Sequence, residues 1–204
     1  MAADGRKGFM LIEIVVALSV VALISLALFS VVRAVPDKER FDTAEETLSQ
    51  IDTAVARFRS KINSNPGKIS HLGTPITLSD SNPCQLYSNQ DVNAWPGTPP
   101  AGGPYINKVF PKDSFALQGV GTIQDDVIRD PPSTGGTQRF HWIRFAVTGV
   151  QRADAIELNE RIDGSADLDP ASPNNLTGQL QWNNPDALGF VTLDYRIVVP
   201  RTPC

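Results

Sequence analysis

A single acidic residue, Glu13, stands at the start of a long apolar stretch near the amino terminus. From Ile14 to Val32 the only polar side chains are three serines, which a helix tolerates because serine can bond a carbonyl of the preceding turn. A helix of this length rises about 28 Å, close to the roughly 30 Å of a bilayer core. A carboxylate in such a setting is costly unless it is paired, so Glu13 is a candidate functional residue.

Two basic residues, a glycine and a phenylalanine lie shortly before this stretch. Arg6 and Lys7 precede Gly8 and Phe9, and this basic flank predicts a cytoplasmic amino terminus with the rest of the chain exported. A plain signal anchor explains the span and the flank but gives Glu13 no role. A cleaved secretory signal would have a shorter apolar region and a small-x-small site, for which residues 33–36 are a poor match.

The run GFMLIE and the helix after it resemble the class III leader of type IV pilins and of the pseudopilins of type II secretion, over Arg6 to about Val35. The resemblance implies cleavage by a prepilin peptidase between Gly8 and Phe9, with methylation of the new Phe9 amine. Glu13 then takes the fifth mature position, where the family keeps a glutamate that can neutralise the Phe9 amine of a neighbouring subunit. A carboxylate that reaches the cytoplasmic interface is the alternative.

The resemblance also implies partners and a location. The partners are other pilin-like subunits, the prepilin peptidase, an inner-membrane assembly platform, and the membrane before assembly. The chain is then a single-pass protein of the bacterial inner membrane with its head in the periplasm, and it joins a periplasmic or extracellular filament. Type IV pilus and secretion pseudopilus both stay open, and the loop-rich head favours a minor or specialised subunit. The alternative from another class is a membrane-anchored binding domain that never polymerises.

The chain has two cysteines, Cys84 and Cys204. In an exported domain an isolated pair indicates an intrachain disulfide. Closing a loop of about 120 residues is worth roughly 4–5 kcal/mol in the chain-entropy model. Two free or intermolecular thiols are the alternative. The resemblance agrees with a bond, since many pilins close the carboxy-terminal part of the head in this way.

Three carboxylates, those of Asp163, Asp167 and Asp169, lie in one turn-rich segment. Oxygen ligands suit calcium, and some pseudopilins hold calcium in a loop of the head, so these residues form a candidate calcium site. Their spacing does not fit an EF-hand, and a solvated acidic turn is the alternative. No other cofactor is expected.

Motifs of catalysis are missing from the sequence. It contains no P-loop, no G-x-S-x-G and no H-E-x-x-H, and we expect no enzyme. Its two histidines, His71 and His141, are too few for a histidine-rich metal site. The formal net charge is −4, and an acidic chain argues against a nucleic acid as the main partner.

Proline at position 36 is expected to kink the helix that carries Glu13, because it removes an amide and clashes with the preceding turn. An amphipathic helix is predicted over residues 37–64, ended by Asn65-Pro66-Gly67. Its apolar residues recur every three or four positions: Phe41, Ala44, Leu48, Ile51, Val55, Phe58 and Ile62. Residues 9–64 would thus form one long kinked helix, with a membrane half and a half packed on the head.

Residues 66–136 are rich in proline and glycine and are predicted to be loops. Apolar alternation predicts strands over 138–147, 178–182 and 191–199, and a short helix is expected over 151–162. Strands with one apolar and one polar face predict an antiparallel sheet laid on the amphipathic helix, which is an α+β fold. The domain organisation expected is a leader (1–8), a transmembrane or assembly helix (9–35) and a head (36–204).

Overall fold

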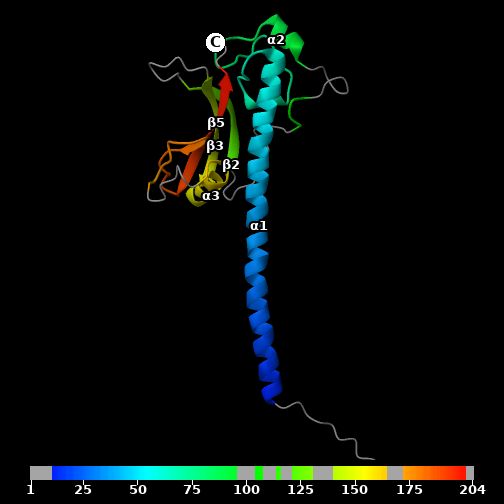
Figure 1. The fold of residues 1–204 in the computed structure, drawn as a ribbon, viewed down its shortest axis with the longest axis vertical. Helices are drawn as coiled ribbons and strands as arrows, with labels where there is room; N and C mark the ends of the chain where they lie inside the picture. Colours follow the sequence, from blue (N-terminus) through cyan, green and yellow to red (C-terminus); the bar gives the residue numbers. More distant parts are fainter. Residues whose placement is uncertain are drawn as a thin grey trace, which may run out of the picture. The chain divides into compact units, whose positions relative to one another are not determined.

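The computed structural model describes residues 11–95, 104–107, 114–115, 121–130, 140–164 and 172–200 (Figure 1), without the side chains of 11–14, 23–37, 114–115 and 140–141. The chain divides into two compact units, Met1–Arg40 and Phe41–Cys204. The first unit contributes the amino-terminal part of the long helix α1. The second unit, called the head below, contains the rest of α1 and all the other elements.

Helix α1 runs from Leu11 to Ile62 and continues through Pro36, whose side chain is outside the described part. The prediction of one helix that continues through this proline is therefore confirmed, and the kink at Pro36 stays a prediction. The helix stops two residues before the predicted end because Asn63 adopts a left-handed conformation with φ of 56°. Asparagine tolerates this conformation, and the Asn63 amide donates to the Arg59 carbonyl at 2.8 Å, which closes the last turn.

The apolar face predicted for the amphipathic half of α1 is confirmed. All seven residues of the predicted stripe are buried, and Ala54 joins them. Each lies three or four positions from the next, so one side of the helix faces the core while Glu45 and Arg57 on the other side are exposed. Burial of this stripe is what fixes the helix to the head.

The head contains an antiparallel sheet with the strand order β1-β2-β3-β5-β4. The strands are β1 (Ser114–Phe115), β2 (Gly121–Arg129), β3 (Phe140–Gln151), β4 (Leu180–Trp182) and β5 (Phe190–Pro200). Helix α3 (Arg152–Ile162) follows β3, as predicted, and adds Ala155 and Leu158 to the core. The α+β fold and the three predicted strands are therefore confirmed, with β3 longer than expected.

The prediction that residues 66–136 form only loops is wrong. This region contains the 3-10 helix η1 (Ile69–Leu72), helix α2 (Asn89–Ala94), and strands β1 and β2. Strand β2 was missed because its pairing with β3 shifts register between Ile123 and Val127. Half-buried Asp125 and exposed Asp126 stand in this irregular part, so the apolar alternation that identifies a strand is interrupted in the sequence between Ile123 and Val127.

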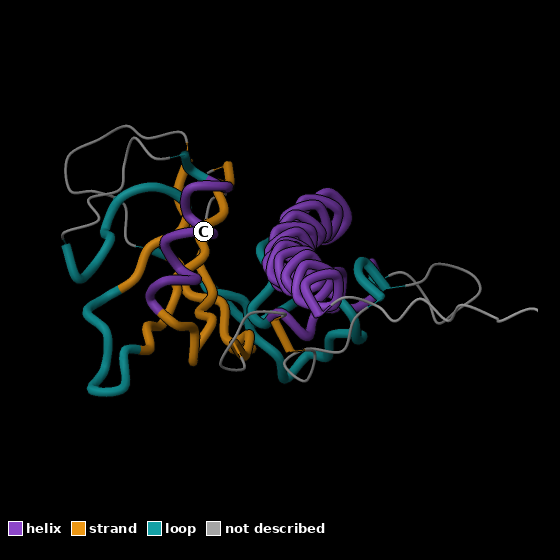
Figure 2. Tube along the Cα trace, turned by 90° about the horizontal axis from the view of Figure 1, so that it is seen from below, coloured by secondary structure: helices purple, strands orange, loops and turns teal. Residues whose placement is uncertain are grey.

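The sheet has one face in the core and one face open. On β5, alternate residues from Val191 to Val199 are buried, whereas Thr192 and Val198 are exposed. Within the head, Figure 2 shows the long helix running beside the strands. The side chains between β5 and α1 form a single core cluster, so the open face of the sheet is the one directed away from that cluster.

Candidate assembly surface and head sites

Residues 15–22 of α1 form an exposed apolar surface. All eight residues are exposed, and seven are alanine, valine or leucine. Leu18 is 64% exposed and Val21 is 59% exposed. The one hydroxyl, that of Ser19, donates to the Val15 carbonyl at 2.8 Å, so it is satisfied within the helix. Eight residues make more than two turns, and the helix is therefore apolar on every side here.

Exposed apolar surfaces of this kind are typical of sites for protein, ligand or membrane interaction. The predicted processing residues Gly8 and Phe9 lie outside the described residues. Glu13 lies in α1, one turn before Ala17, but its side chain also falls outside them. The processing site and the pairing of Glu13 stay predictions.

A search of the described residues finds no helix that is both long enough and apolar enough to cross a membrane.

Cys84 is disulfide-bonded, and Cys204, the chain's other cysteine, lies outside the described residues. The turn that carries Cys84 is held by Asn82, whose side-chain oxygen accepts from the amides of Cys84 and Gln85 at 2.8 and 2.7 Å. The side-chain nitrogen Nδ2 of Asn82 donates to the Ser64 hydroxyl at 2.8 Å. This turn is thereby fixed to the end of α1.

The last strand is tied to the same end of α1. Arg59 donates from its guanidinium to the Pro200 carbonyl at 3.0 Å, and burial lowers the pKa of this arginine. The turn of Cys84 and the end of β5 are thus attached to one helix end. Pairing of Cys84 with Cys204 remains our prediction, and this anchoring is the feature that favours it. Neither Asn82 nor Arg59 belongs to a sequence motif, so these two contacts could not be predicted from the sequence.

Asp163, the first residue of the candidate calcium site, forms hydrogen bonds that hold two elements of the head together. Its two carboxylate oxygens accept from the backbone amides of Gln179 (3.0 Å) and Leu180 (2.8 Å). The Asn159 side chain donates to it as well, at 3.2 Å. Asp163 therefore connects the end of α3 to the start of β4. Asp167 and Asp169 lie outside the described residues.

No group of three or more histidine, cysteine or acidic side chains suited to a metal is found where side chains are described. Calcium binding stays a prediction.

His71, which sequence reasoning left without a role, is a buried residue of η1. Its Nδ1 lies 3.3 Å from the Tyr87 hydroxyl, and its Nε2 lies 3.8 Å from Oδ1 of Asp80. Burial lowers the pKa of His71, against the opposing effect of the carboxylates of Asp80 and Asp125. The imidazole is therefore held neutral as part of the core. The His141 side chain lies outside the described part.

The open face of the sheet carries a network of two arginines and two aspartates. Nε of Arg144 on β3 donates to Asp130 at 2.8 Å, and its NH1 donates to Asp194 at 2.7 Å. Arg196 on β5 donates to the same Asp130 from Nε at 2.9 Å and from NH2. The guanidinium of Arg196 also lies 5.5 Å from the centre of the Trp142 ring. The charges cancel, so the network joins strands and offers no net charge to a ligand.

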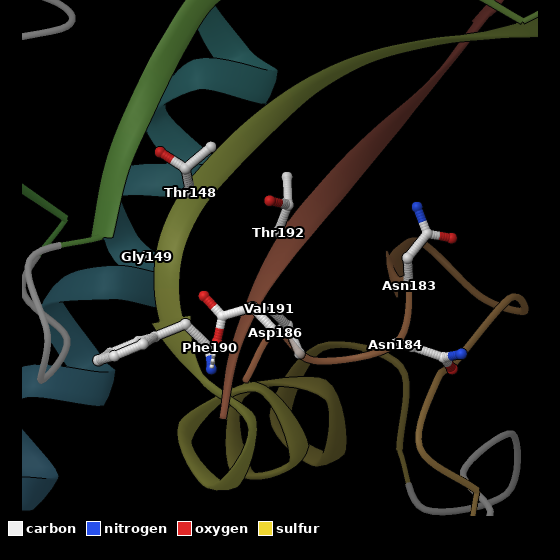
Figure 3. A pocket seen from close by; sticks show the side chains of 8 residues that line it. All are labelled: Thr148, Gly149, Asn183, Asn184, Asp186, Phe190, Val191 and Thr192. Atoms are coloured by element: carbon white, nitrogen blue, oxygen red, sulfur yellow. Dashed lines mark hydrogen bonds between the residues drawn. The ribbon is translucent and has the colours of Figure 1, made fainter. Parts of the chain in front are cut away.

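A cavity of about 470 Å³ opens on the sheet at the junction of β3, β5 and the segment between β4 and β5. Figure 3 shows the residues that line it, which are Thr148, Gly149, Asn183, Asn184, Asp186, Phe190, Val191 and Thr192. Four of the eight residues, Thr148, Asn183, Asn184 and Thr192, carry a hydroxyl or an amide. The lining is thus mixed, with one carboxylate and the apolar side chains of Phe190 and Val191 beside these polar groups.

Comparison of the chain with protein-family models, with curated proteins and with solved structures gives no match in any of the three. The functional argument therefore depends on the residues of this chain.

Proposed function

We propose that the protein is a structural subunit of a type IV pilus-like or pseudopilus filament. It is processed between Gly8 and Phe9 and assembled through its amino-terminal helix. The observation that carries the proposal is the exposed apolar segment 15–22 of α1, which lies one residue after the GFMLIE run in the sequence. The α+β head, with a sheet packed on the second half of that helix, also supports it.

The apolar segment has to be shielded from water in every state of the subunit. Five of its side chains, those of Val15, Val16, Leu18, Val20 and Val21, are 49–64% exposed. Fully burying such a side chain contributes about 1.5–3 kcal/mol relative to water, so burying the exposed half of these five contributes about 5 kcal/mol per subunit. The bilayer offers similar apolar surroundings before assembly, so a bundle of such helices can replace it, and close packing between helices then favours the filament.

Glu13 determines the axial register between neighbouring subunits and adds little to the stability of the filament. Cleavage at Gly8 creates a cationic amine on Phe9, and the Glu13 carboxylate of one subunit pairs with the amine of the next. A buried ion pair adds little net stability compared with apolar packing, but leaving one member unpaired costs about 3–5 kcal/mol. Subunits therefore assemble only at the axial position where the two charges meet.

A minor or specialised subunit is the favoured form of this proposal, because loops make up much of the head.

The second candidate function is a membrane-anchored binding domain that does not polymerise. The observation that favours it is the cavity between β3, β5 and the β4–β5 connection, which filament assembly through α1 does not use.

Replacement of Glu13 separates the two functions. In a filament, Glu13→Ala leaves the neighbour's Phe9 amine unpaired, so the variant should be processed normally and yet be missing from sheared filaments. Glu13→Gln should be intermediate, since it keeps an acceptor without the charge. Glu45→Ala, an exposed glutamate of the same helix within the head, is the matched control and should assemble normally.

Three measurements are needed on each variant: intact mass, membrane level, and incorporation into filaments or crosslinking to neighbours. A wild-type mass that begins at Met1 would refute processing at Gly8. Wild-type incorporation of Glu13→Ala would refute the pairing. A wild-type chain that never crosslinks to a pilin-like subunit would favour the anchored binding domain.

A further inference from the structure

We propose that the cavity between β3, β5 and the β4–β5 connection binds a neutral saccharide. This inference goes beyond filament assembly, because none of the cavity residues belongs to α1. The cavity volume of about 470 Å³ lies within the range of roughly 300–1,000 Å³ that is typical of small-molecule sites.

The backbone shapes the cavity. Pairing between β3 and β5 shifts register between Val147 and Val150, so the strand bulges at Thr148 and Gly149. Gly149 adopts φ of 74°, a conformation that glycine reaches without a steric penalty. Bulges of this type often lie next to binding sites, because they redirect side chains. Here the bulge places Thr148 at the rim, near Thr192 of β5 (Figure 3).

The opposite wall is held in place by Asp186. Its Oδ1 accepts from the amides of Leu188 and Phe190, both at 2.9 Å. The Asp186 amide donates to the Phe190 carbonyl at 2.8 Å. These bonds order residues 186–190, the part of the wall that follows Asn183 and Asn184 in the chain. A wall that is partly ordered before binding lowers the entropic cost of binding a ligand.

The lining chemistry selects the ligand class. The side chains of Asn183, Asn184 and Thr192 are exposed and make no hydrogen bond to other described residues. Amides and hydroxyls both donate and accept hydrogen bonds, as sugar hydroxyls do. Half-buried Phe190 adds an aromatic surface suited to the apolar face of a pyranose ring.

Charged and apolar ligands fit the lining less well. The cavity contains no lysine or arginine, so an anion finds no counter-charge. Its single carboxylate, that of Asp186, already accepts from two amides, whereas calcium needs six to eight oxygens. An apolar ligand would leave the amides and hydroxyls unpaired, which costs affinity.

The test is saturation-transfer NMR on the full chain in a phosphocholine detergent, which has no sugar headgroup. The probes are glucose, galactose, mannose and N-acetylglucosamine, each as the free sugar and as a short oligomer. At least one probe should bind. The difference between monomer and oligomer tells whether the ligand is a free sugar or a glycan chain.

Two variants locate the site. Asn183→Ala and Thr192→Val each remove one hydrogen-bonding group and should weaken binding about fivefold. Asn93→Ala in α2 and Thr53→Val in α1 are exposed matched controls and should bind as the wild type does. The proposal is overturned if no probe binds, or if the cavity variants bind as tightly as their controls. Either result leaves the filament proposal intact, since Glu13 is tested separately.

Discussion

Removal of the Asp163 carboxylate should destabilise the head whether or not calcium is present. Asp163 accepts from the backbone amides of Gln179 and Leu180 and from the Asn159 side chain. Asp163→Ala deletes all of these bonds and leaves the amide at the start of β4 facing the apolar core around Leu180, which is fully buried. Asp163→Asn keeps one oxygen acceptor but turns an NH₂ group toward a backbone amide.

The magnitude follows from the number and type of bonds lost. A hydrogen bond to a charged group contributes about 1.5–3 kcal/mol when it is buried. Asp163 is half-buried, so solvent compensates part of the loss, and we expect about 2–4 kcal/mol for Asp163→Ala and about 1–2 kcal/mol for Asp163→Asn. In a domain of this size, 1 kcal/mol corresponds to about 2–4 °C in Tm. Asp163→Ala should therefore lower Tm by roughly 4–16 °C.

The assay is a thermal melt of the full chain in detergent, with EDTA and with added calcium. Destabilisation of Asp163→Ala in EDTA confirms the structural role. Asp167→Asn and Asp169→Asn serve as comparison variants. If calcium binds, the wild type should gain stability with calcium and these two variants should lose that gain. A melt of Asp163→Ala in EDTA that equals the wild type would refute the hydrogen-bond argument.

Three further predictions concern the head. Burial lowers the pKa of His71 below its ordinary 6.5. The unfolded chain therefore binds more protons at this residue, and the stability of the head should fall as the pH drops below about 6.5. The difference in Tm between pH 7.5 and pH 5.5 should be smaller in His71→Gln than in the wild type, and an unchanged difference would contradict the argument. Labelling of unfolded, unreduced protein should find no free thiol at Cys84 or Cys204, and reduction should cost a few kcal/mol; two labels per chain would exclude the bond. Asp130→Ala should cost about 2–3 kcal/mol because two arginines lose a shared acceptor, whereas a melt within 1 °C of the wild type would mean that water replaces that acceptor.

Local periodicity in the sequence was sufficient to predict much of the fold. The stripe from Phe41 to Ile62 repeats every three or four residues, and a helix with such a stripe must bury it. The alternation from Val191 to Val199 determined the strand and its core-facing side in the same way. Helix α3 and strand β4 were predicted from similarly short patterns.

Features that depend on pairing with distant segments could not be predicted. Strand β2 carries a register shift that only its contact with β3 explains. The loop prediction for residues 66–136 failed because proline and glycine content does not indicate which segments of the region pair with a strand elsewhere in the chain.

For the candidate sites, the sequence alone predicts the one near the amino terminus. Glu13 is singled out because it is an acid beside a long apolar run, and the resemblance to the pilin leader implies the roles of Gly8, Phe9 and Glu13. The tertiary structure decided the rest: the bonding of Asp163 to Leu180, the turn of Cys84 held at Ser64, and the cavity formed by the bulge at Gly149. These arrangements depend on hydrogen bonds between segments far apart in the chain. No local pattern encodes such bonds, since each exists only after the sheet has brought the two segments together.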